Sequence, residues 1–305
     1  MSININLKKV VSFVLIFIFL IPVNCKFERA YAVIPKTNEN LFDKYSSKSK
    51  SNKLGMDDLP AKSYILTDYK TGQVLYEKNP DEKRRVASIT KIMTMLLIVE
   101  AIENKKLSLD DMAVATENAK PANDEASIWL AVGEKMSVKD LLKAVAVNSC
   151  NDAARILAEH VAGSEEAFVK LMNKKAKEIG MNNTNFCNAS GLDVDEQYST
   201  ARDIAKIAKE IMKYKWITNY TSLIDGTLKN GKFKLNNTNL LIRTYNGCNG
   251  LKTGTTKTAG NCLCATASRN NIFLCAVSLG SNTKSERFKT CRSLLDYGFK
   301  NYQKI

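Results

Sequence analysis

The chain of 305 residues contains only one histidine, His160. Histidine is the usual general base of a Ser/His/Asp triad and a common metal ligand. His160 lies in an apolar segment, residues 156–161, and no partner motif accompanies it. We therefore expect His160 to be structural and the protein to lack a Ser/His/Asp triad. We also expect no metal and no cofactor.

Long apolar runs are equally scarce. One such run, residues 10–23, follows two lysines and precedes the small-residue sequence at 30–32. This order of basic, apolar and small residues is typical of a cleavable signal peptide. We expect residues 1–32 to be removed before Val33 and the mature protein to be exported to the cell wall or the membrane surface. An uncleaved anchor is the alternative, although the run is short for a membrane span.

Apolar side chains are also sparse in residues 33–58, a stretch rich in Lys, Ser and Asn. Such a segment cannot bury enough apolar surface to join a core, which predicts a flexible linker. The remainder, residues 59–305, has the length of one large domain, and no internal repeat is visible.

Acidic residues are in the minority, because 45 Lys and Arg stand against 31 Asp and Glu, for a formal net charge of +14. This charge favours anionic partners such as cell-wall polymers through long-range attraction. The basic residues are spread along the chain without a nucleic-acid-binding motif, so we expect no nucleic-acid partner.

The chain has eight cysteines, of which one precedes Val33. An odd number would remain after cleavage, so at least one thiol is unpaired. Cys262 and Cys264 alternate with apolar residues on a strand-like segment. This alternation predicts small core side chains and not a disulfide or a metal pair.

A serine and a lysine, Ser88 and Lys91, stand where a charged stretch gives way to the apolar residues 89–99. The apolar run predicts a buried helix with Ser88 at its N-terminus. Residues three apart share a helix face, so the amine and the hydroxyl are expected to be neighbours. Burial lowers the pKa of a lysine and makes its neutral amine available as a base. An N-cap serine beside a solvated lysine is the alternative.

A polar cluster, residues 148–151, separates two segments that are predicted to be helices. A capping-box sequence at Ser137 introduces the first helix, and the second covers residues 152–161. The hydroxyl of Ser149 and the amide of Asn151 need partners in such a place, and facing a neighbouring site they would relay a proton and bind a substrate amide. Taken alone, the cluster is more simply an interhelix turn.

The sequence Lys252-Thr253-Gly254 precedes two apolar runs, residues 262–267 and 272–279, that predict a β-hairpin. On a strand beside this hairpin, the lysine and the threonine would offer a cation and a hydroxyl to a carboxylate. The glycine would let the backbone approach a neighbour closely.

All three patterns have further copies, which begin at Ser2, Ser47, Lys70, Ser268 and Ser281. Order and spacing distinguish the proposed set, whose members are separated by 61 and 103 residues (88 to 149 and 149 to 252). In this arrangement the chain resembles the penicillin-recognising serine enzymes. Longer matches at 87–94, 185–193, 198–203 and 249–254 make it similar to the serine D-alanyl-D-alanine carboxypeptidases, the low-molecular-mass penicillin-binding proteins.

The resemblance implies roles for the motif residues. Ser88 would be the acylated nucleophile, Lys91 its general base and Ser149 a proton relay. The substrate would be bound by the remaining candidates, which are Asn151, Lys252, Thr253, Gly254, Thr255 and Arg287. The backbone N–H groups of Ser88 and Thr255 would form the oxyanion hole. For Arg287, which carries the weakest match, a solvated helix position is the alternative.

The implied reaction is removal of the terminal D-alanine from peptidoglycan stem pentapeptides through a Ser88 acyl-enzyme, with β-lactam antibiotics as covalent inhibitors. A class A β-lactamase shares the motifs but needs a Glu-x-x-Leu-Asn segment, which is not found between Asn151 and Lys252. A catalytically weak wall-binding protein of the same fold is a further alternative, against which the intact motifs argue. We expect the chain to end with its catalytic domain, without the β-rich second domain and amphipathic helix that many such enzymes carry.

The resemblance and the order of segments predict the same architecture, an α/β (α+β) fold of the β-lactamase and transpeptidase type. We expect a hairpin at about 62–78, helices from Ser88 to about Tyr214, strands from about Ile217 to Leu279 and a last helix over 287–301. This order predicts a mostly antiparallel sheet flanked by helices, with an all-helical lobe beside it.

Overall fold

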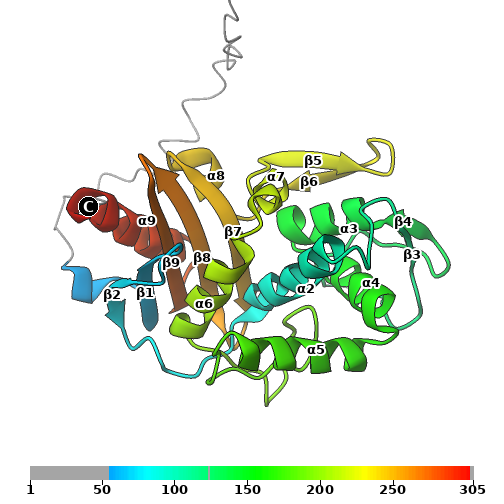
Figure 1. Cartoon of the computed structure of the whole chain (residues 1–305), viewed down its shortest axis with the longest axis horizontal. Coiled ribbons are helices and arrows are strands. Elements are labelled where there is room, and N and C mark those ends of the chain that lie inside the picture. The colour runs from blue at the N-terminus through cyan, green and yellow to red at the C-terminus, as the bar shows by residue number, and fades with distance from the viewer. Residues whose placement is uncertain (1–54, 123, 303–305) are drawn as a thin grey trace, which may run out of the picture. The chain divides into compact units, whose positions relative to one another are not determined.

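The computed structural model describes residues 55–122 and 124–302. The expected signal peptide, residues 1–32, lies outside the described residues. A five-stranded sheet with the strand order β2-β1-β9-β8-β7 forms the centre of the described part (Figure 1). Each strand pairs antiparallel with its neighbours, which confirms the predicted sheet. The strands are β1 (Ser63–Asp68), β2 (Val74–Lys78), β7 (Cys248–Thr256), β8 (Gly260–Arg269) and β9 (Ile272–Ser281).

Helices cover both faces of this sheet, because successive residues of its central strands point to opposite sides and both sides are apolar. Helix α9 (Lys284–Asn301) packs on one face, where Leu294 joins a cluster with Leu66 of β1 and Leu274 of β9. Helix α6 (Ala201–Ile211) packs on the other face, in the cluster that contains Val277 of β9.

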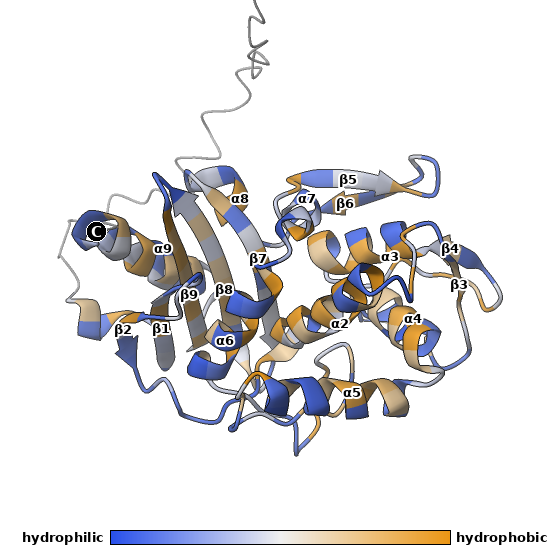
Figure 2. Ribbon diagram, in the orientation of Figure 1, coloured by the Kyte–Doolittle hydropathy of each residue, from blue (hydrophilic) through white to orange (hydrophobic). Residues whose placement is uncertain are grey.

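The helical lobe beside the sheet is built around α2 (Lys91–Glu103), which contacts α4 (Asn151–Ala162) and α5 (Glu165–Glu178). Residues 91–99 of α2 are all buried, as expected for a helix that is apolar all round. Helix α5 lies at the surface, and its ribbon alternates between hydrophilic and hydrophobic residues in Figure 2. Its buried side chains recur every four residues, at Phe168, Met172 and Ala176.

Side-chain caps fix where two of the predicted helices begin. Ser137 accepts a hydrogen bond from the backbone N–H of Asp140 and starts α3 (Val138–Lys143), as predicted. The last helix begins at Lys284 and not at Arg287, because Thr283 and Glu286 form a reciprocal capping box.

The structure differs from the sequence expectation in two stretches. The hairpin of β3 (Met112–Val114) and β4 (Lys135–Ser137) interrupts the expected run of helices, and strands this short are too brief to show an alternating pattern. Short helices at α7 (Thr218–Thr221) and α8 (Leu241–Thr244) lie among the expected strands. Between these helices stands the hairpin of β5 (Asp225–Leu228) and β6 (Phe233–Asn236).

The expected linker, residues 33–58, is described only at its end, since residues 33–54 lie outside the described residues. Met56–Asp58 form a short 3-10 helix, η1. The hydroxyl of Tyr64 donates to the carbonyl oxygen of Met56 over 2.7 Å, and the hydroxyl of Tyr76 donates to the carboxylate of Asp57. This end of the segment therefore packs against β1 and β2.

The seven cysteines in the described ranges are all free thiols. Cys262 and Cys264 are buried on β8, which confirms their prediction as core residues. The Sγ atom of Cys264 lies 3.7 Å from that of Cys275 on β9, without a bond between them. None of the helices formed by residues 55–122 and 124–302 has the length and apolarity needed to cross a lipid bilayer.

Candidate active site

The nucleophile candidate, Ser88, lies in a short 3-10 helix, η2 (Ala87–Thr90), that runs directly into α2. This position confirms the predicted placement at a helix N-terminus, with Lys91 as the first residue of α2. Ala87 has a φ angle of +49°, in the left-handed region that is unfavourable for alanine. Such backbone strain persists only where the surrounding structure holds it.

Two glycines from distant parts of the chain press against this turn. A Cβ atom on Gly254 of β7 would lie 2.7 Å from the carbonyl oxygen of Val86 and 3.0 Å from the backbone nitrogen of Ser88. A Cβ atom on Gly191 would lie 2.1 Å from the carbonyl oxygen of Ala87. Any side chain at either position would displace the turn, so glycine is required at both.

Lys91 is completely buried, and its Nζ atom has three close oxygen neighbours. It lies 3.0 Å from Ser88 Oγ, 2.5 Å from Asn151 Oδ1 and 2.6 Å from the carbonyl oxygen of Ser190. Burial, assisted by the positive charge of Arg155, lowers the pKa of Lys91 to about 7 against the opposing effect of Cys150, Glu125 and Asp152. A substantial fraction of the amine is therefore neutral at physiological pH.

The two acceptors around Lys91 determine how its neutral amine is oriented. A neutral amine has two N–H groups and one lone pair. The oxygen of the Asn151 amide and the carbonyl of Ser190 can only accept hydrogen bonds, so they take the two N–H groups. The lone pair is then directed at Ser88 Oγ, which is the geometry that removal of the hydroxyl proton requires.

A tight loop holds the Ser190 carbonyl in this place. The side-chain oxygen of Asn188 accepts hydrogen bonds from the backbone N–H groups of Gly191 and Leu192, at 2.6 and 3.1 Å. The neighbouring carbonyl of Ala189 accepts a hydrogen bond from Thr94 of α2 over 2.6 Å. The resemblance at 185–193 assigned no role to this loop, although the sequence Asn188-Ala189-Ser190-Gly191 is rich in turn-forming residues.

The second motif forms the predicted interhelix turn, between the π-helix η3 (Ala144–Asn148) and α4. Ser149 takes a left-handed conformation with a φ angle of +63°, and only 8% of its surface is exposed. Cys150 is fully buried, and its burial raises the pKa of the thiol to about 12. The turn brings Asn151 to Lys91. His160 is exposed in the last turn of α4.

The third motif lies on β7, where Lys252 is completely buried. Its pKa is well below the usual range, first because of burial and then because Lys91 and Arg287 are positively charged neighbours. Lys91 and Arg287 thus both disfavour the protonated form of Lys252. An anion bound beside Lys252 would favour its protonated, positively charged form.

A contact that sequence reasoning missed joins this strand to the helical lobe. Thr253 Oγ1 donates a hydrogen bond to Thr238 Oγ1 over 2.7 Å. The backbone N–H of Thr238 donates to the carbonyl oxygen of Val147 in η3 over 3.1 Å. Thr238 lies on an irregular segment between β6 and α8, and it matches no motif that would have singled it out.

Arg287 of α9 is directed at the same strand. Its Nη1 atom donates to the carbonyl oxygen of Gly254 and to Thr255 Oγ1, over 3.1 and 2.8 Å. Only 5% of its surface is exposed, so the alternative of a solvated helix position is wrong. Burial lowers the pKa of Arg287 to about 10, and the guanidinium stays charged at neutral pH.

A second missed element is a mostly enclosed ion pair next to Asn151. Glu125, on the connection between β3 and β4, accepts a hydrogen bond from Arg155 Nη2 over 2.8 Å. The same carboxylate oxygen accepts one from Asn151 Nδ2 over 3.3 Å. The sequence offered no signal for Glu125, because it stands in an irregular loop without a motif.

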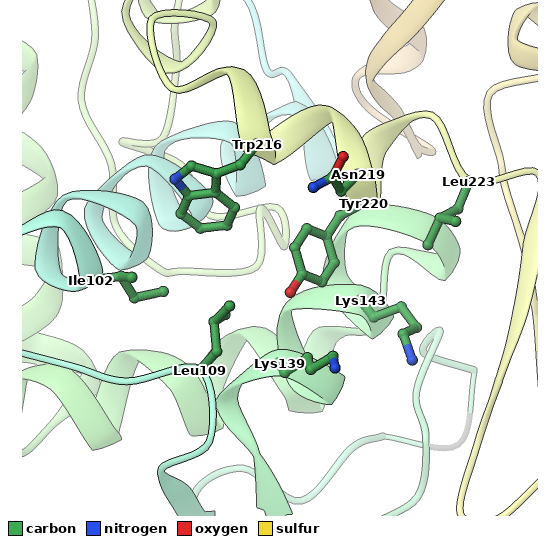
Figure 3. A pocket seen from close by; sticks show the side chains of 8 residues that line it. All are labelled: Ile102, Leu109, Lys139, Lys143, Trp216, Asn219, Tyr220 and Leu223. Carbon is green, nitrogen blue, oxygen red and sulfur yellow. The ribbon is translucent and has the colours of Figure 1, made fainter. Parts of the chain in front are cut away.

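A groove elsewhere on the lobe shares no residue with this site (Figure 3). Its volume is about 470 Å³, and the Trp216 and Tyr220 rings with Leu109 supply much of its apolar lining. Lys139 and Lys143 of α3 lie at its border in the same view. Within residues 55–122 and 124–302, His, Cys, Asp and Glu side chains do not gather in groups of three that could hold a metal ion.

Comparison with known proteins identifies the family to which this chain belongs. Residues 47–283 match the family model of the peptidase S11 D-alanyl-D-alanine carboxypeptidases. The chain is 45% identical over 246 residues to the D-alanyl-D-alanine carboxypeptidase DacF of Bacillus subtilis, and 39% identical over 251 residues to DacC of Escherichia coli. These alignments include 80% of this chain and 63% and 62% of the two relatives. The chain thus spans somewhat less than two thirds of their length.

Solved structures agree. The D-alanyl-D-alanine carboxypeptidase DacD from Francisella tularensis matches with a TM-score of 0.77 and 30% identity, over 86% of this chain and 75% of that one. Penicillin-binding protein D2 from Listeria monocytogenes, solved in an ampicillin-bound form, matches with a TM-score of 0.71 and 34% identity, over 79% of this chain and 98% of that one. Because the family model matches most of this chain, residues 47–283, the chain belongs to the D-alanyl-D-alanine carboxypeptidase family of serine peptidases.

Proposed function

We propose that the protein is a serine D-Ala-D-Ala carboxypeptidase that removes the terminal D-alanine from peptidoglycan stem pentapeptides. The observation that carries this proposal is the buried Lys91 amine, 3.0 Å from Ser88 Oγ and held by two acceptor oxygens. Ser88 is the nucleophile in this proposal, and Lys91 is the base that activates it.

Acylation begins when Ser88 Oγ attacks the carbonyl carbon of the penultimate D-alanine and Lys91 takes the hydroxyl proton. The carbonyl oxygen becomes an oxyanion, which the backbone N–H groups of Ser88 and Thr255 stabilise. Collapse of this intermediate breaks the peptide bond, and the proton passes to the leaving amine by way of Ser149. Water then gives a proton to Lys91 and attacks the ester carbonyl. The bond between the acyl carbon and Ser88 Oγ breaks, the peptide leaves as a carboxylate, and Lys91 returns the proton to Ser88 Oγ.

The terminal carboxylate of the substrate is bound by the positive charge of Lys252 and Arg287 and by the hydroxyl of Thr253. Support comes from the accumulation of cations at this end of β7, which an arriving carboxylate neutralises. Gly254 keeps the strand close enough to Ser88 for one substrate to reach both groups. Asn151 holds the substrate amide.

β-Lactam antibiotics acylate Ser88 in the same proposal, since they present a strained amide and a carboxylate in similar positions. The Listeria relative was solved with ampicillin and also with cefotaxime. This supports a covalent penicillin adduct for the present chain.

The decisive test is incubation of the purified protein with a diacylated L-Lys-D-Ala-D-Ala peptide. Mass spectrometry should detect one released D-alanine per peptide, and the Ser88→Ala variant should release none. Fast hydrolysis of penicillin without release of D-alanine would instead indicate a β-lactamase. Binding of the peptide without release of D-alanine would indicate a wall-binding protein.

We further propose that residues 1–32 direct export, that residues 33–58 form a flexible linker and that residues 59–305 form the catalytic domain. N-terminal sequencing of the exported protein should begin at Val33, whereas an intact N-terminus would indicate an anchor. The excess of basic over acidic residues, which persists after removal of residues 1–32, supports an attraction to anionic wall polymers. Retention on such polymers should then weaken as salt is raised.

A further inference from the structure

The Asn151 side chain is held at both ends, by groups of opposite character. Its Oδ1 atom faces the Lys91 amine at 2.5 Å, and its Nδ2 atom faces Glu125 Oε2 at 3.3 Å. A carboxylate can only accept hydrogen bonds, so it binds the NH₂ end of the amide and excludes the flipped orientation. The flipped amide would present its N–H groups to Lys91 and lose both interactions.

Arg155 holds the Glu125 side chain in this position. The guanidinium Nη2 lies 2.8 Å from Glu125 Oε2, and the two side chains are only 9% and 11% exposed. Arg155 is itself fixed by the carbonyl oxygen of Lys120, at 3.3 Å. An ion pair this well enclosed has little freedom to rotate.

The backbone around Glu125 is attached to the same helix terminus. The N–H of Asn151 donates to the carbonyl oxygen of Ala126 over 2.7 Å. The carboxylate of Asp152, which is 1% exposed, accepts hydrogen bonds from the N–H groups of Ile128 and Trp129. Loop and helix therefore form one unit, and the position of Glu125 relative to Asn151 does not depend on its side chain alone.

We propose that Glu125 is a positioning residue for acylation: its carboxylate fixes the Asn151 amide so that the amide oxygen holds the Lys91 amine with its lone pair toward Ser88. This inference rests on the proposed function, in which Lys91 is the base. Without the carboxylate, the amide samples both orientations, and the Lys91 amine loses the acceptor that sets its direction.

The charge of Glu125 has a separate effect on Lys91. The charged and titratable groups that act on the Lys91 amine are Cys150, Arg155, Glu125, Asp152 and Lys252. A negative Glu125 favours the protonated amine, so its removal lowers the pKa of Lys91 and leaves more neutral base. A purely electrostatic role therefore predicts faster acylation near neutral pH after neutralisation of Glu125. The positioning role predicts slower acylation at every pH.

The test compares the Glu125→Gln variant with the native chain in acylation by a fluorescent penicillin, from pH 5.5 to 9. Gln keeps the shape of the side chain and removes its fixed acceptor character. We expect the rate constant on the high-pH plateau to fall by about 10-fold to 100-fold, as for a misplaced catalytic group. The pH midpoint should move to lower pH. A plateau equal to that of the native chain would overturn the proposal.

Glu134→Gln is the matched control. Glu134 lies on the same β3–β4 connection and pairs with Lys229 at 3.0 Å, away from Asn151. This variant should acylate at the native rate. Thermal unfolding of both variants shows whether each is folded. Glu125→Asp keeps the charge and draws back the carboxylate, so its acylation rate should lie between those of the native chain and Glu125→Gln. A loss of acylation rate in Glu134→Gln as large as that in Glu125→Gln would contradict a specific role of Glu125.

A double-mutant cycle with Asn151→Ala tests the route of the effect. If Glu125 acts through the amide, Glu125→Gln should change the acylation rate little when Asn151 is already Ala. Full additivity would overturn the proposal. Failure of the proposed function would give a different result. If Lys91 is not the base, the acylation rate of the native chain should show no pH midpoint near the pKa of Lys91, and the same should hold for the variants at position 125.

Discussion

The amine of Lys91 and the hydroxyl of Ser88 lie 3.0 Å apart at the start of α2, where the lysine is completely buried and the serine is partly exposed. In the proposed mechanism, the buried partner must lose its charge to act as a base. The partly exposed partner must meet the substrate. Burial thus separates the two roles within one helical turn.

The pH dependence of acylation follows from this burial. Burial lowers the pKa of Lys91 to about 7, so the amine is protonated below this value and neutral above it. Only the neutral amine accepts the Ser88 proton, so the acylation rate should rise with pH through about 7 and level off above it. Stopped-flow acylation by a fluorescent penicillin measures this, and a rate that is constant from pH 5.5 to 9 would contradict it.

Replacement of Lys91 should slow acylation strongly. We expect Lys91→Ala to lower the acylation rate by at least about 10²-fold, the lower range of general-base contributions, while the fold is retained. Lys143→Ala is the control, because Lys143 pairs with Asp140 at 3.0 Å away from the site. Circular dichroism confirms folding. Unchanged acylation in a folded Lys91→Ala protein would remove Lys91 from the role of base.

The penicillin adduct should be long-lived. The chain between Asn151 and Lys252 has no Glu-x-x-Leu-Asn segment to activate a deacylating water. We expect one penicilloyl group per chain, attached to Ser88 and stable for minutes or longer. Intact-mass analysis with peptide mapping detects it, and rapid recovery of unmodified protein would be the opposite result.

Gly254 offers a steric test of the site. In Gly254→Ala the new Cβ would lie 2.7 Å from the Val86 carbonyl oxygen, so the backbone must move. We expect a loss of about 1–3 kcal/mol in the free energy of unfolding, as for overpacking, together with slower acylation. Gly226→Ala is the matched control, because its Cβ would meet only the Lys143 side chain at 3.7 Å. Equal stability of the two variants would contradict this reading.

Arg287 should act on binding of the carboxylate more than on the chemical step. We expect Arg287→Gln to raise KM for a peptide ending in D-Ala-D-Ala by about tenfold, the loss of one hydrogen bond to a charged group. A substrate whose terminal carboxylate is amidated should be nearly unaffected. Arg292→Gln, one turn further along α9, is the control because Arg292 binds Thr244 at the surface. Equal losses on both substrates would assign Arg287 a structural role only.

Features that depend on neighbouring residues could be predicted from the sequence. The Ser88–Lys91 pair, the Ser137 cap and the β8–β9 hairpin depend on spacings of a few residues, which helix and strand periodicity determine. The predicted burial of Lys91 followed from the apolar helix that contains it.

Features that depend on contacts between distant irregular segments could not be predicted. Glu125 meets Arg155 across 30 positions of the chain, and Asn151 across 26. Neither the loop of Glu125 nor the segment of Thr238 has a periodic pattern, so only the folded backbone brings them to the site. The burial of Arg287 could not be predicted from the sequence either, because its partners lie on the distant strands β7 and β8.

The thiol of Cys150 gives the second motif an internal reporter. It lies between Ser149 and Asn151 and is completely enclosed in the folded chain. A bulky maleimide can reach it only when the turn opens, so its labelling rate measures how often this part of the active site unfolds locally. Comparison of the labelling rate before and after acylation of Ser88 would give, as an opening free energy, the change in stability of this turn when a β-lactam is bound.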